Sequence, residues 1–272
     1  MSDSNTSSTS SSLGRFSPAP APKGNAIALW NKPSAEYTQK LKATEDFLRQ
    51  ITAQYQPITL ACSLGAEDMV LLHMLHSLEL PCEAFVLQTG KLNPETLELL
   101  ALVQQKYGAE RAIRIYEPDA EHAAKFVAEN GEDAMYQSLE LRKACCHIRK
   151  MVPLAAALRG KRAWITGLRR EQSAARADVP LHSSDGSHDD GHGHPIPREK
   201  FNPLTDWTWG DVWHYISSQG VPYNSLHDQF YPSIGCQPCT RSVTLGEDFR
   251  AGRWWWESND LKECGLHIKP QG

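Results

Sequence analysis

The sequence lacks any apolar run of the roughly 18 to 20 residues that a helix needs to span a bilayer. It also lacks a basic N-terminal segment followed by an apolar run, the pattern of a secretory signal. An excess of positive charge is missing too, because the net charge is −4, and this argues against nucleic acid as the main partner. We therefore expect a cytoplasmic protein that binds neither membrane nor nucleic acid.

Cysteine, by contrast, is well represented, with seven residues. Because the cytosol keeps thiols reduced, these cysteines favour metal binding or catalysis over a disulfide framework. Five of them form two pairs and one isolated residue: Cys145 and Cys146 in RKACCHIRK, Cys236 and Cys239 in GCQPCT, and Cys264 in ECGLH. Four thiolates can enclose a zinc ion or an iron-sulfur cluster, which leaves the fifth for chemistry. Cys62 and Cys82, in apolar surroundings, are expected in the core.

The chain divides by composition into three parts. Residues 1–25 are rich in Ser, Thr, Pro and Ala, and they are expected to form a disordered tail. Residues 26–250 are expected to form one α/β domain with the nucleotide and metal sites, because a chain of 272 residues can bury a sizeable core. Residues 251–272 are expected to be a mobile C-terminal segment that carries Cys264.

Hydrophobic periodicity predicts strands that alternate with helices. Strands are predicted at 57–62, 81–87, 112–116 and 162–167, and helices at 34–55, 69–78, 93–107 and 208–218. This alternation predicts a Rossmann-like parallel sheet flanked by helices, with ligands bound after the strand C-termini. Residues 181–198 are rich in Gly, Asp and His and are expected to form a solvated surface loop; divalent metal capture by its histidines is the alternative.

The loop SLGAED, residues 63–68, follows a predicted buried strand and precedes a helix. Ser63 and Gly65 would offer a hydroxyl, backbone N–H groups and a helix N-terminus to an anion, although an ordinary strand-helix turn has similar residues. The loop matches neither the Walker pattern nor GxGxxG. It resembles the phosphate-binding loop of the PP-loop adenine nucleotide hydrolases. Its single glycine and missing closing serine weaken an ATP-hydrolysing interpretation.

The loop, the two cysteine pairs and the motifs TGLRREQS, FNPLTDW, FRAGRWWW and ECGLH together resemble the assimilatory adenylyl-sulfate reductases, the iron-sulfur branch of the PAPS/APS reductase family. The resemblance runs from about residue 45 to 267. It implies reduction of adenosine 5′-phosphosulfate (adenylyl sulfate) to sulfite and AMP, in sulfate assimilation and cysteine biosynthesis. It also implies thioredoxin or a glutaredoxin as reductant. A homo-oligomer is compatible with the sequence, which does not specify the oligomeric state.

The same resemblance implies a [4Fe-4S] cluster held by Cys145, Cys146, Cys236 and Cys239. From the residues alone zinc stays open, although neighbouring side chains on a helix diverge by about 100°, which a larger cluster accommodates more easily. The resemblance places Lys150 between cluster and substrate, where its charge would help to hold the phosphosulfate; otherwise it belongs to a solvated basic helix face.

Further cations are implied for the phosphosulfate, because guanidinium forks suit phosphate and sulfate oxygens. The resemblance assigns this role to Arg176, Arg250 and Arg253, and less clearly to Arg170; as isolated residues they would be surface charges. Leu64 stands where some relatives have serine, and Gln88 stands where relatives usually have aspartate. These departures affect the nucleotide contacts rather than the reaction.

Cys264 is the predicted nucleophile, with an ordinary cysteine on a mobile tail as the alternative. Its thiolate would attack the sulfur of adenylyl sulfate, expel AMP and carry an S-sulfonate. Nearby cations would lower the thiol pKa, and His267 would orient or stabilise the site. The protein reductant would then attack the inner sulfur and release sulfite.

Three other functions stay open. A phosphoadenylyl-sulfate (PAPS) reductase would differ in nucleotide specificity. A PP-loop ATP pyrophosphatase would release pyrophosphate and would not need Cys264. A non-enzymatic iron-sulfur redox sensor would be expected to carry a basic DNA-reading element, which this acidic chain lacks.

Overall fold

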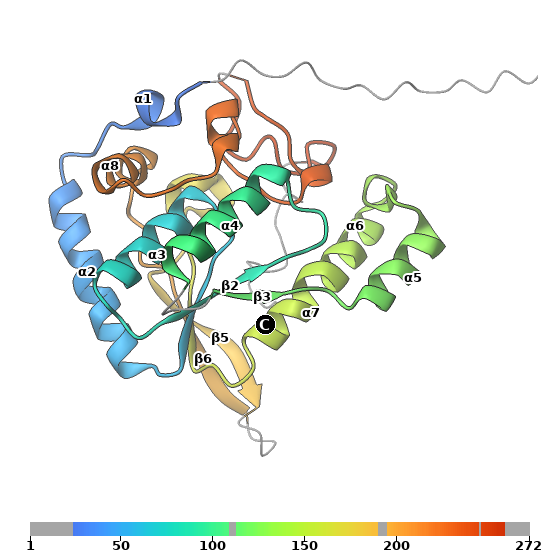
Figure 1. Ribbon diagram of the computed structural model, residues 1–272, viewed down its shortest axis with the longest axis horizontal. Coiled ribbons are helices and arrows are strands. Elements are labelled where there is room, and N and C mark those ends of the chain that lie inside the picture. Colours follow the sequence, from blue (N-terminus) through green and yellow to red (C-terminus); the bar gives the residue numbers. More distant parts are fainter. Residues whose placement is uncertain (1–23, 109–112, 190–194, 245, 259–272) are drawn as a thin grey trace, which may run out of the picture.

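The computed structural model describes residues 24–108, 113–189, 195–244 and 246–258 (Figure 1). Its sheet has six strands in the order β3-β2-β1-β4-β6-β5. The strands are β1 (Ile58–Ala61), β2 (Glu83–Leu87), β3 (Ile113–Tyr116), β4 (Ala163–Ile165), β5 (His182–Asp189) and β6 (Pro195–Phe201). All neighbouring strands are parallel except β5, which is antiparallel to β6. The predicted α/β class, with a mostly parallel sheet flanked by helices, is confirmed.

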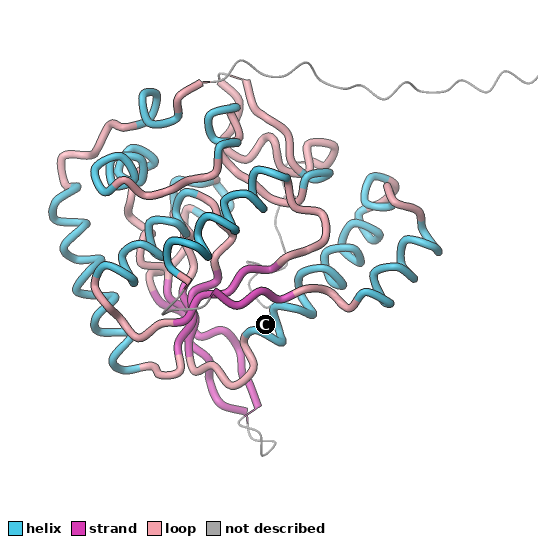
Figure 2. Tube along the Cα trace, viewed as in Figure 1, coloured by secondary structure: helices cyan, strands magenta, loops and turns pink. Residues whose placement is uncertain are grey.

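Helices cover both sides of this sheet. The α-helices are α1 (Ala26–Trp30), α2 (Tyr37–Gln54), α3 (Ala66–Ser77), α4 (Pro94–Tyr107), α5 (Ala120–Asn130), α6 (Leu139–Cys146), α7 (Val152–Ala157) and α8 (Trp209–Gln219), and a π-helical turn, η2 (His147–Met151), joins α6 to α7. Short 3-10 turns are η1 (Ala134–Tyr136), η3 (Arg170–Gln172), η4 (Ala174–Arg176), η5 (Ser225–Gln229) and η6 (Gln237–Cys239). Figure 2 shows the strands converging at the centre of the molecule with helices around them.

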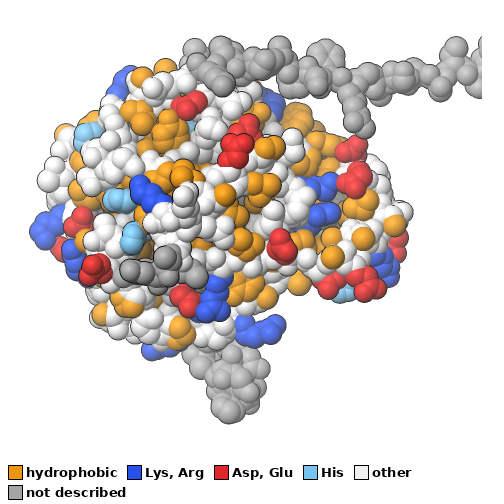
Figure 3. All heavy atoms as spheres, in the orientation of Figure 1, with side chains coloured by type: hydrophobic (Ala, Val, Ile, Leu, Met, Phe, Trp, Pro, Cys, Tyr) orange, Lys and Arg blue, Asp and Glu red, His pale blue; other side chains and the backbone are white. Residues whose placement is uncertain are grey.

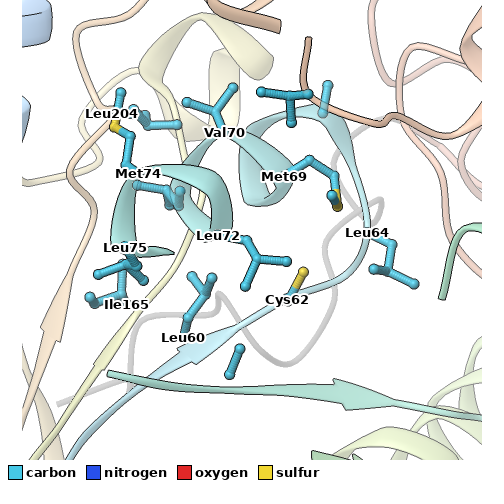
Figure 4. Packing of buried hydrophobic residues seen from close by; sticks show 14 of the residues in the cluster. Leu60, Cys62, Leu64, Met69, Val70, Leu72, Met74, Leu75, Ile165 and Leu204 are labelled. Carbon is cyan, nitrogen blue, oxygen red and sulfur yellow. The ribbon is translucent and has the colours of Figure 1, made fainter. Parts of the chain in front are cut away.

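Two hydrophobic clusters fix these layers. The larger joins α2, α3, α4 and α8 to the sheet, and in Figure 4 Leu60 of β1 and Cys62 lie beneath Leu72 of α3. On the other side, Leu154 and the end of α7 are packed with Phe85 of β2 and Trp164 of β4. α5 and α6 lie with α7 at one end of the molecule, and α7 connects this group to the sheet (Figure 1).

Local sequence signals set several of the boundaries. Pro94 occupies the first turn of α4, where its missing N–H costs nothing. At the start of α8 the Thr208 hydroxyl accepts from the Asp211 amide, and the Asp211 carboxylate accepts from the Thr208 amide, as the capping-box pattern predicts. Gly220, with φ of 61°, ends this helix in the left-handed region.

The prediction of a surface loop over residues 181–198 is wrong. β5 and β6 form a hairpin there, and β6 continues the sheet because Ala163 and Ile165 of β4 pair with Glu199 and Phe201. The composition suited a flexible loop, but pairing with an existing strand edge overrides local preference. The hairpin also makes the sheet mixed rather than wholly parallel.

The displayed surface is charged but not of one sign. Figure 3 shows acidic and basic side chains interspersed among hydrophobic ones on that face. Within the ranges that the structure describes, no helix is both long and apolar enough to cross a bilayer.

Candidate functional site

One cavity lies where the strand order changes direction. The chain leaves β1 toward β2 on one side and returns through β4 on the other, so the loops after β1 and β4 diverge. In open α/β sheets, ligands bind at this switch point. The cavity and the open space at its mouth together measure about 970 Å³. Its apolar walls include Phe85, Leu154 and Trp164, and its polar lining includes Ser63, Asp68, Lys150, Thr166 and Arg176.

Asp68 joins the two loops at the base of this cavity. Its Oδ2 accepts from the Ser63 amide (2.7 Å) and hydroxyl (2.6 Å), and its Oδ1 accepts from the Gly167 amide (3.0 Å). Burial raises the pKa of Asp68 to about 6, although these bonds act in the opposite direction. Only glycine fits at position 167, because a Cβ there would lie 2.4 Å from the Asp68 Oδ1. The carboxylate therefore holds the loops after β1 and β4 in one arrangement.

In the predicted phosphate loop, Ser63 is bonded within the protein, although it was expected to face an anion. Both donors of Ser63 are directed to Asp68, so its hydroxyl is occupied by the protein itself. Leu64 is fully buried in the core with φ of 63°, in the left-handed region. This turn brings Gly65 to the N-cap of α3, although Gly65 does not line the cavity. The helix N-terminus, rather than the serine, is the feature suited to an anion.

Arg176 belongs to a buried chain of polar side chains. The Glu67 carboxylate accepts from Arg169 Nε and from Gln172 Nε2, both at 2.9 Å. Gln172 Oε1 in turn accepts from Arg176 Nη1 at 2.7 Å. Arg169 is fully buried and Arg176 is 6% exposed, so each needs such partners. The network fixes the Arg176 guanidinium at the cavity wall.

The four paired cysteines line a second, smaller cavity, which together with the open space at its mouth measures about 310 Å³. One pair ends α6 and the other flanks η6, so the structure brings together residues about 90 positions apart. Cys145, Cys236 and Cys239 are buried, and Cys146 is partly exposed. Over the part of the chain that the structure describes, no group of three or more His, Cys, Asp or Glu side chains is arranged to hold a single metal ion.

The thiols of this second cavity influence one another. Burial and the neighbouring Cys236 and Cys146 raise the pKa of Cys239 to about 12. Burial also opposes ionisation of Cys236, but Lys150, the Thr89 hydroxyl at 3.2 Å and two arginines together lower its pKa. Thiols that disfavour one another's ionisation can all become thiolates when a cationic centre lies between them. The donor set therefore fits a thiolate-bound metal centre.

Basic residues surround the cysteine cavity and connect it to the first one. Its lining includes Lys91, Arg142, Arg149 and Lys150. Lys150 lines both cavities and therefore connects them. Arg149 Nη1 donates to the carbonyl of Thr89 (2.9 Å), which ties the π-helical turn to the loop after β2.

Arg250 and Arg253 lie behind the first cavity. They are 7% and 6% exposed, and neither lines the cavity. Arg253 Nη1 donates to the carbonyl of Ile234, and Arg250 Nη1 lies 3.4 Å from the Ser233 hydroxyl. Because Ile234 belongs to the cavity wall, Arg253 supports that wall directly, whereas Arg250 contacts Ser233, the residue before it.

Other predicted residues have different outcomes. Arg170 has a 42% exposed side chain paired with Asp206, so it is a surface cation. Gln88 Oε1 accepts from the Gly90 amide at 3.0 Å, a local turn contact. Cys264 and His267 lie outside the described residues. Glu67 and Gln172 were not singled out from the sequence, although they lie within the quoted runs SLGAED and TGLRREQS.

Comparison with known proteins places the chain among sulfonucleotide enzymes. Residues 57–242 match the phosphoadenosine phosphosulfate reductase domain. The chain is 48% identical over 233 residues to the adenosine 5′-phosphosulfate reductase of Burkholderia cepacia, covering 86% of this chain and 89% of that protein. It is also 48% identical over 225 residues to the enzyme of the same name from Allochromatium vinosum, covering 83% and 84%.

A solved structure shares the fold. The phosphoadenylyl-sulfate (PAPS) reductase of Candida auris, in a phosphate complex, matches with a TM-score of 0.58 at 24% identity, covering 76% of this chain and 94% of that one. At that identity the likeness concerns the fold alone. The sequence relatives decide the assignment: this chain is a member of the phosphoadenosine phosphosulfate reductase family.

Proposed function

We propose that this protein is an adenylyl-sulfate reductase that uses thioredoxin or a glutaredoxin to reduce adenosine 5′-phosphosulfate to sulfite and AMP. The observation that carries the proposal is that the cavity at the sheet switch point and the four-cysteine cavity share Lys150. The 48% identical relatives bear the name of this activity. The reaction belongs to sulfate assimilation and cysteine biosynthesis, and we place it in the cytoplasm.

The first cavity would bind the nucleotide. Its apolar walls at Phe85, Leu154 and Trp164 suit adenosine. The phosphosulfate would lie toward Lys150, Arg176 and the N-terminus of α3. Arg250 and Arg253 would act from behind the wall through residues 233–235.

Cys264 would supply the nucleophile. Its thiolate attacks the sulfate sulfur, an S–S bond forms, and the S–O bond to the phosphate breaks, so AMP leaves with the bridging oxygen. A thiolate of the reductant then attacks Cys264 Sγ and releases sulfite. The second thiol of the reductant resolves the mixed disulfide and restores Cys264. The dithiol loses two electrons and the sulfate sulfur gains them. His267 would orient the site from three residues away.

Cys145, Cys146, Cys236 and Cys239 would hold a [4Fe-4S] cluster. When bound, the cluster would supply electrostatic and structural support, because a dithiol reductant already delivers electrons in pairs. Lys150, next to both cavities, would keep its charge available to the phosphosulfate while it favours the thiolate of Cys236.

Nucleotide competition tests this proposal. The purified protein with reduced thioredoxin should release AMP and sulfite from adenylyl sulfate at least tenfold faster than it releases 3′,5′-ADP and sulfite from the phosphorylated analogue. The reverse preference would establish a phosphoadenylyl-sulfate reductase instead. Pyrophosphate release from ATP, with neither sulfonucleotide consumed, would favour the PP-loop pyrophosphatase. No nucleotide binding at all would favour a redox sensor.

A further inference from the structure

The end of the described chain is fastened to the cysteine cavity through its backbone. The Trp254 amide donates to the carbonyl of Cys239 at 3.2 Å, and the Arg241 amide donates to that of Gly252 at 3.0 Å. Thr240 and Arg253 form an antiparallel bridge between these two contacts. The segment that leads to Cys264 is therefore attached directly beside the second cysteine pair.

A buried ion pair adds a second attachment. Glu257 accepts two bonds from Arg142, Nε to Oε1 and Nη2 to Oε2, each 2.8 Å long. The side chains are only 2% and 7% exposed. Arg142 lies on α6, three residues before Cys145. Because two parallel bonds fix orientation as well as distance, this pair fixes the position and direction of the chain at Glu257 relative to α6.

Trp254 packs the two attachments into one unit. Its ring is 1% exposed, and the guanidinium carbons of Arg142 and Arg253 lie 4.7 and 4.6 Å from the ring centroid. Cations at such distances are attracted to the face of an indole. Arg142 therefore contacts both the tryptophan and Glu257, so the cysteine helix and residues 252–257 are held as one body.

The ion pair lies close to Cys264 in the sequence. Cys264 lies seven residues beyond Glu257 and ten beyond Trp254. Seven residues reach at most about 25 Å when fully extended. Because effective concentration falls roughly as the −3/2 power of tether length, release of Glu257 alone would lower it by about twofold. Loss of the fixed direction of the chain at Glu257 would lower the effective concentration of the thiol further.

We infer that Arg142 and Glu257 are positioning residues, which hold the root of the Cys264 segment so that its thiol meets the nucleotide cavity. This inference rests on the proposed function, because it assumes that Cys264 receives the sulfonate. Neither residue is expected to touch the substrate. Glu257 has no sequence signal of its own, since it appears only as an acidic residue after three tryptophans.

The test compares two glutamates that make the same kind of bidentate arginine contact. Glu257→Gln breaks the buried pair, whereas Glu247→Gln breaks the Arg241 pair, whose side chains are 38% and 30% exposed. Each protein, purified anaerobically, is mixed with adenylyl sulfate without reductant, and the sulfonate on Cys264 is followed by mass spectrometry. Iron content, AMP affinity and hydrogen exchange of the 252–257 amides are measured in parallel. Glu257→Asp, which keeps the charge, serves as the conservative variant.

We expect Glu257→Gln to slow sulfonate transfer by two- to tenfold and to speed exchange over residues 252–257. AMP affinity and iron content should stay within twofold of the parent protein. Glu247→Gln should leave all four readouts unchanged, and Glu257→Asp should recover part of the transfer rate. An unchanged rate in Glu257→Gln would overturn the inference. So would a parallel loss of iron and AMP affinity, which would indicate general structural support. Absence of sulfonate in the parent protein would instead overturn the proposed function.

Discussion

The nucleotide cavity and the cysteine cavity are built by different means. The first stands at the C-terminal ends of the central strands β1 and β4, where Asp68 ties the loops after these strands together through three hydrogen bonds. The second lies outside the sheet, between α6, the π-helical turn η2, η6 and the loop after β2. Buried carboxylates organise the first, whereas cations converge on the second. Both cavities therefore depend on contacts between distant segments, but only the first is placed by the strand order of the sheet.

These differences predict that each cavity can be damaged while the other survives. The largest effect is expected from Cys236→Ser, because Lys150, the Thr89 hydroxyl and two arginines together lower the pKa of this thiol despite its burial. Bound iron should fall more than tenfold, while AMP affinity should change less than threefold. Cys82→Ala, in the core and away from both cavities, is the control and should keep its iron. Equal loss of iron and AMP affinity would show that the two cavities are one unit.

The next largest effect is expected in the buried chain of polar side chains around Glu67. Glu67→Gln removes the charge opposite the fully buried Arg169, which keeps its bonds to Glu171 and Trp207. We expect a loss of about 2 to 3 kcal/mol in the free energy of unfolding, somewhat less than for a buried ion with no remaining partner. The neighbouring exposed pair gives the matched control: Asp206→Asn, opposite Arg170, should cost under about 1 kcal/mol. Urea unfolding measures both losses, and similar values would contradict the role of Glu67 as the buried counter-charge of Arg169.

Gly167→Ala should harm the nucleotide cavity alone. The added methyl would lie 2.4 Å from Asp68 Oδ1 and would push apart the two loops that Asp68 joins. We expect AMP affinity to fall about tenfold, or about 1.4 kcal/mol, with iron content unchanged. Gly160→Ala controls for stability, since position 160 has φ of 71° but open space around it. It should weaken folding without weakening AMP binding; an equal effect on AMP would refute the loop mechanism.

The smallest effect is a pH dependence from Asp68. Its pKa is about 6 in the folded protein, above the ordinary 3.8, so the folded state binds this proton more tightly than the unfolded chain. The stabilisation of the folded state by this proton is complete below about pH 4 and disappears as the pH rises through 6. Asp68 should therefore make the protein about 1 kcal/mol less stable at pH 7 than at pH 5.

Comparison with Asp68→Asn isolates this contribution. Burial lowers the pKa of His227 to about 4, which gives an opposite slope over part of the same range, but both proteins contain that histidine. Urea unfolding at pH 5 and pH 7 should show the extra loss only in the parent protein. An identical pH slope in the two proteins would mean that Asp68 stays ionised throughout.

The two cavities also differ in how far the sequence predicts them. Strand-helix alternation predicted the sheet and the loop at Ser63, because these features depend on local periodicity. The partner of that serine, Asp68, is five residues away, but its bond to Gly167 required the tertiary structure. The paired cysteines were visible as motifs, whereas the Arg142–Glu257 contact spans 115 residues and has no local pattern. The hairpin of β5 and β6 was missed for the same reason, since β4 provides its pairing edge.

The most direct test of the account is to find where the sulfonate goes. Protein purified anaerobically, with its iron measured, is incubated with adenylyl sulfate and no reductant, and its peptides are weighed by mass spectrometry. The account predicts one S-sulfonate on Cys264, formed in equal amount with AMP and removed as sulfite by reduced thioredoxin. Release of AMP with no adduct on Cys264, or an adduct on one of the four paired cysteines, would contradict it.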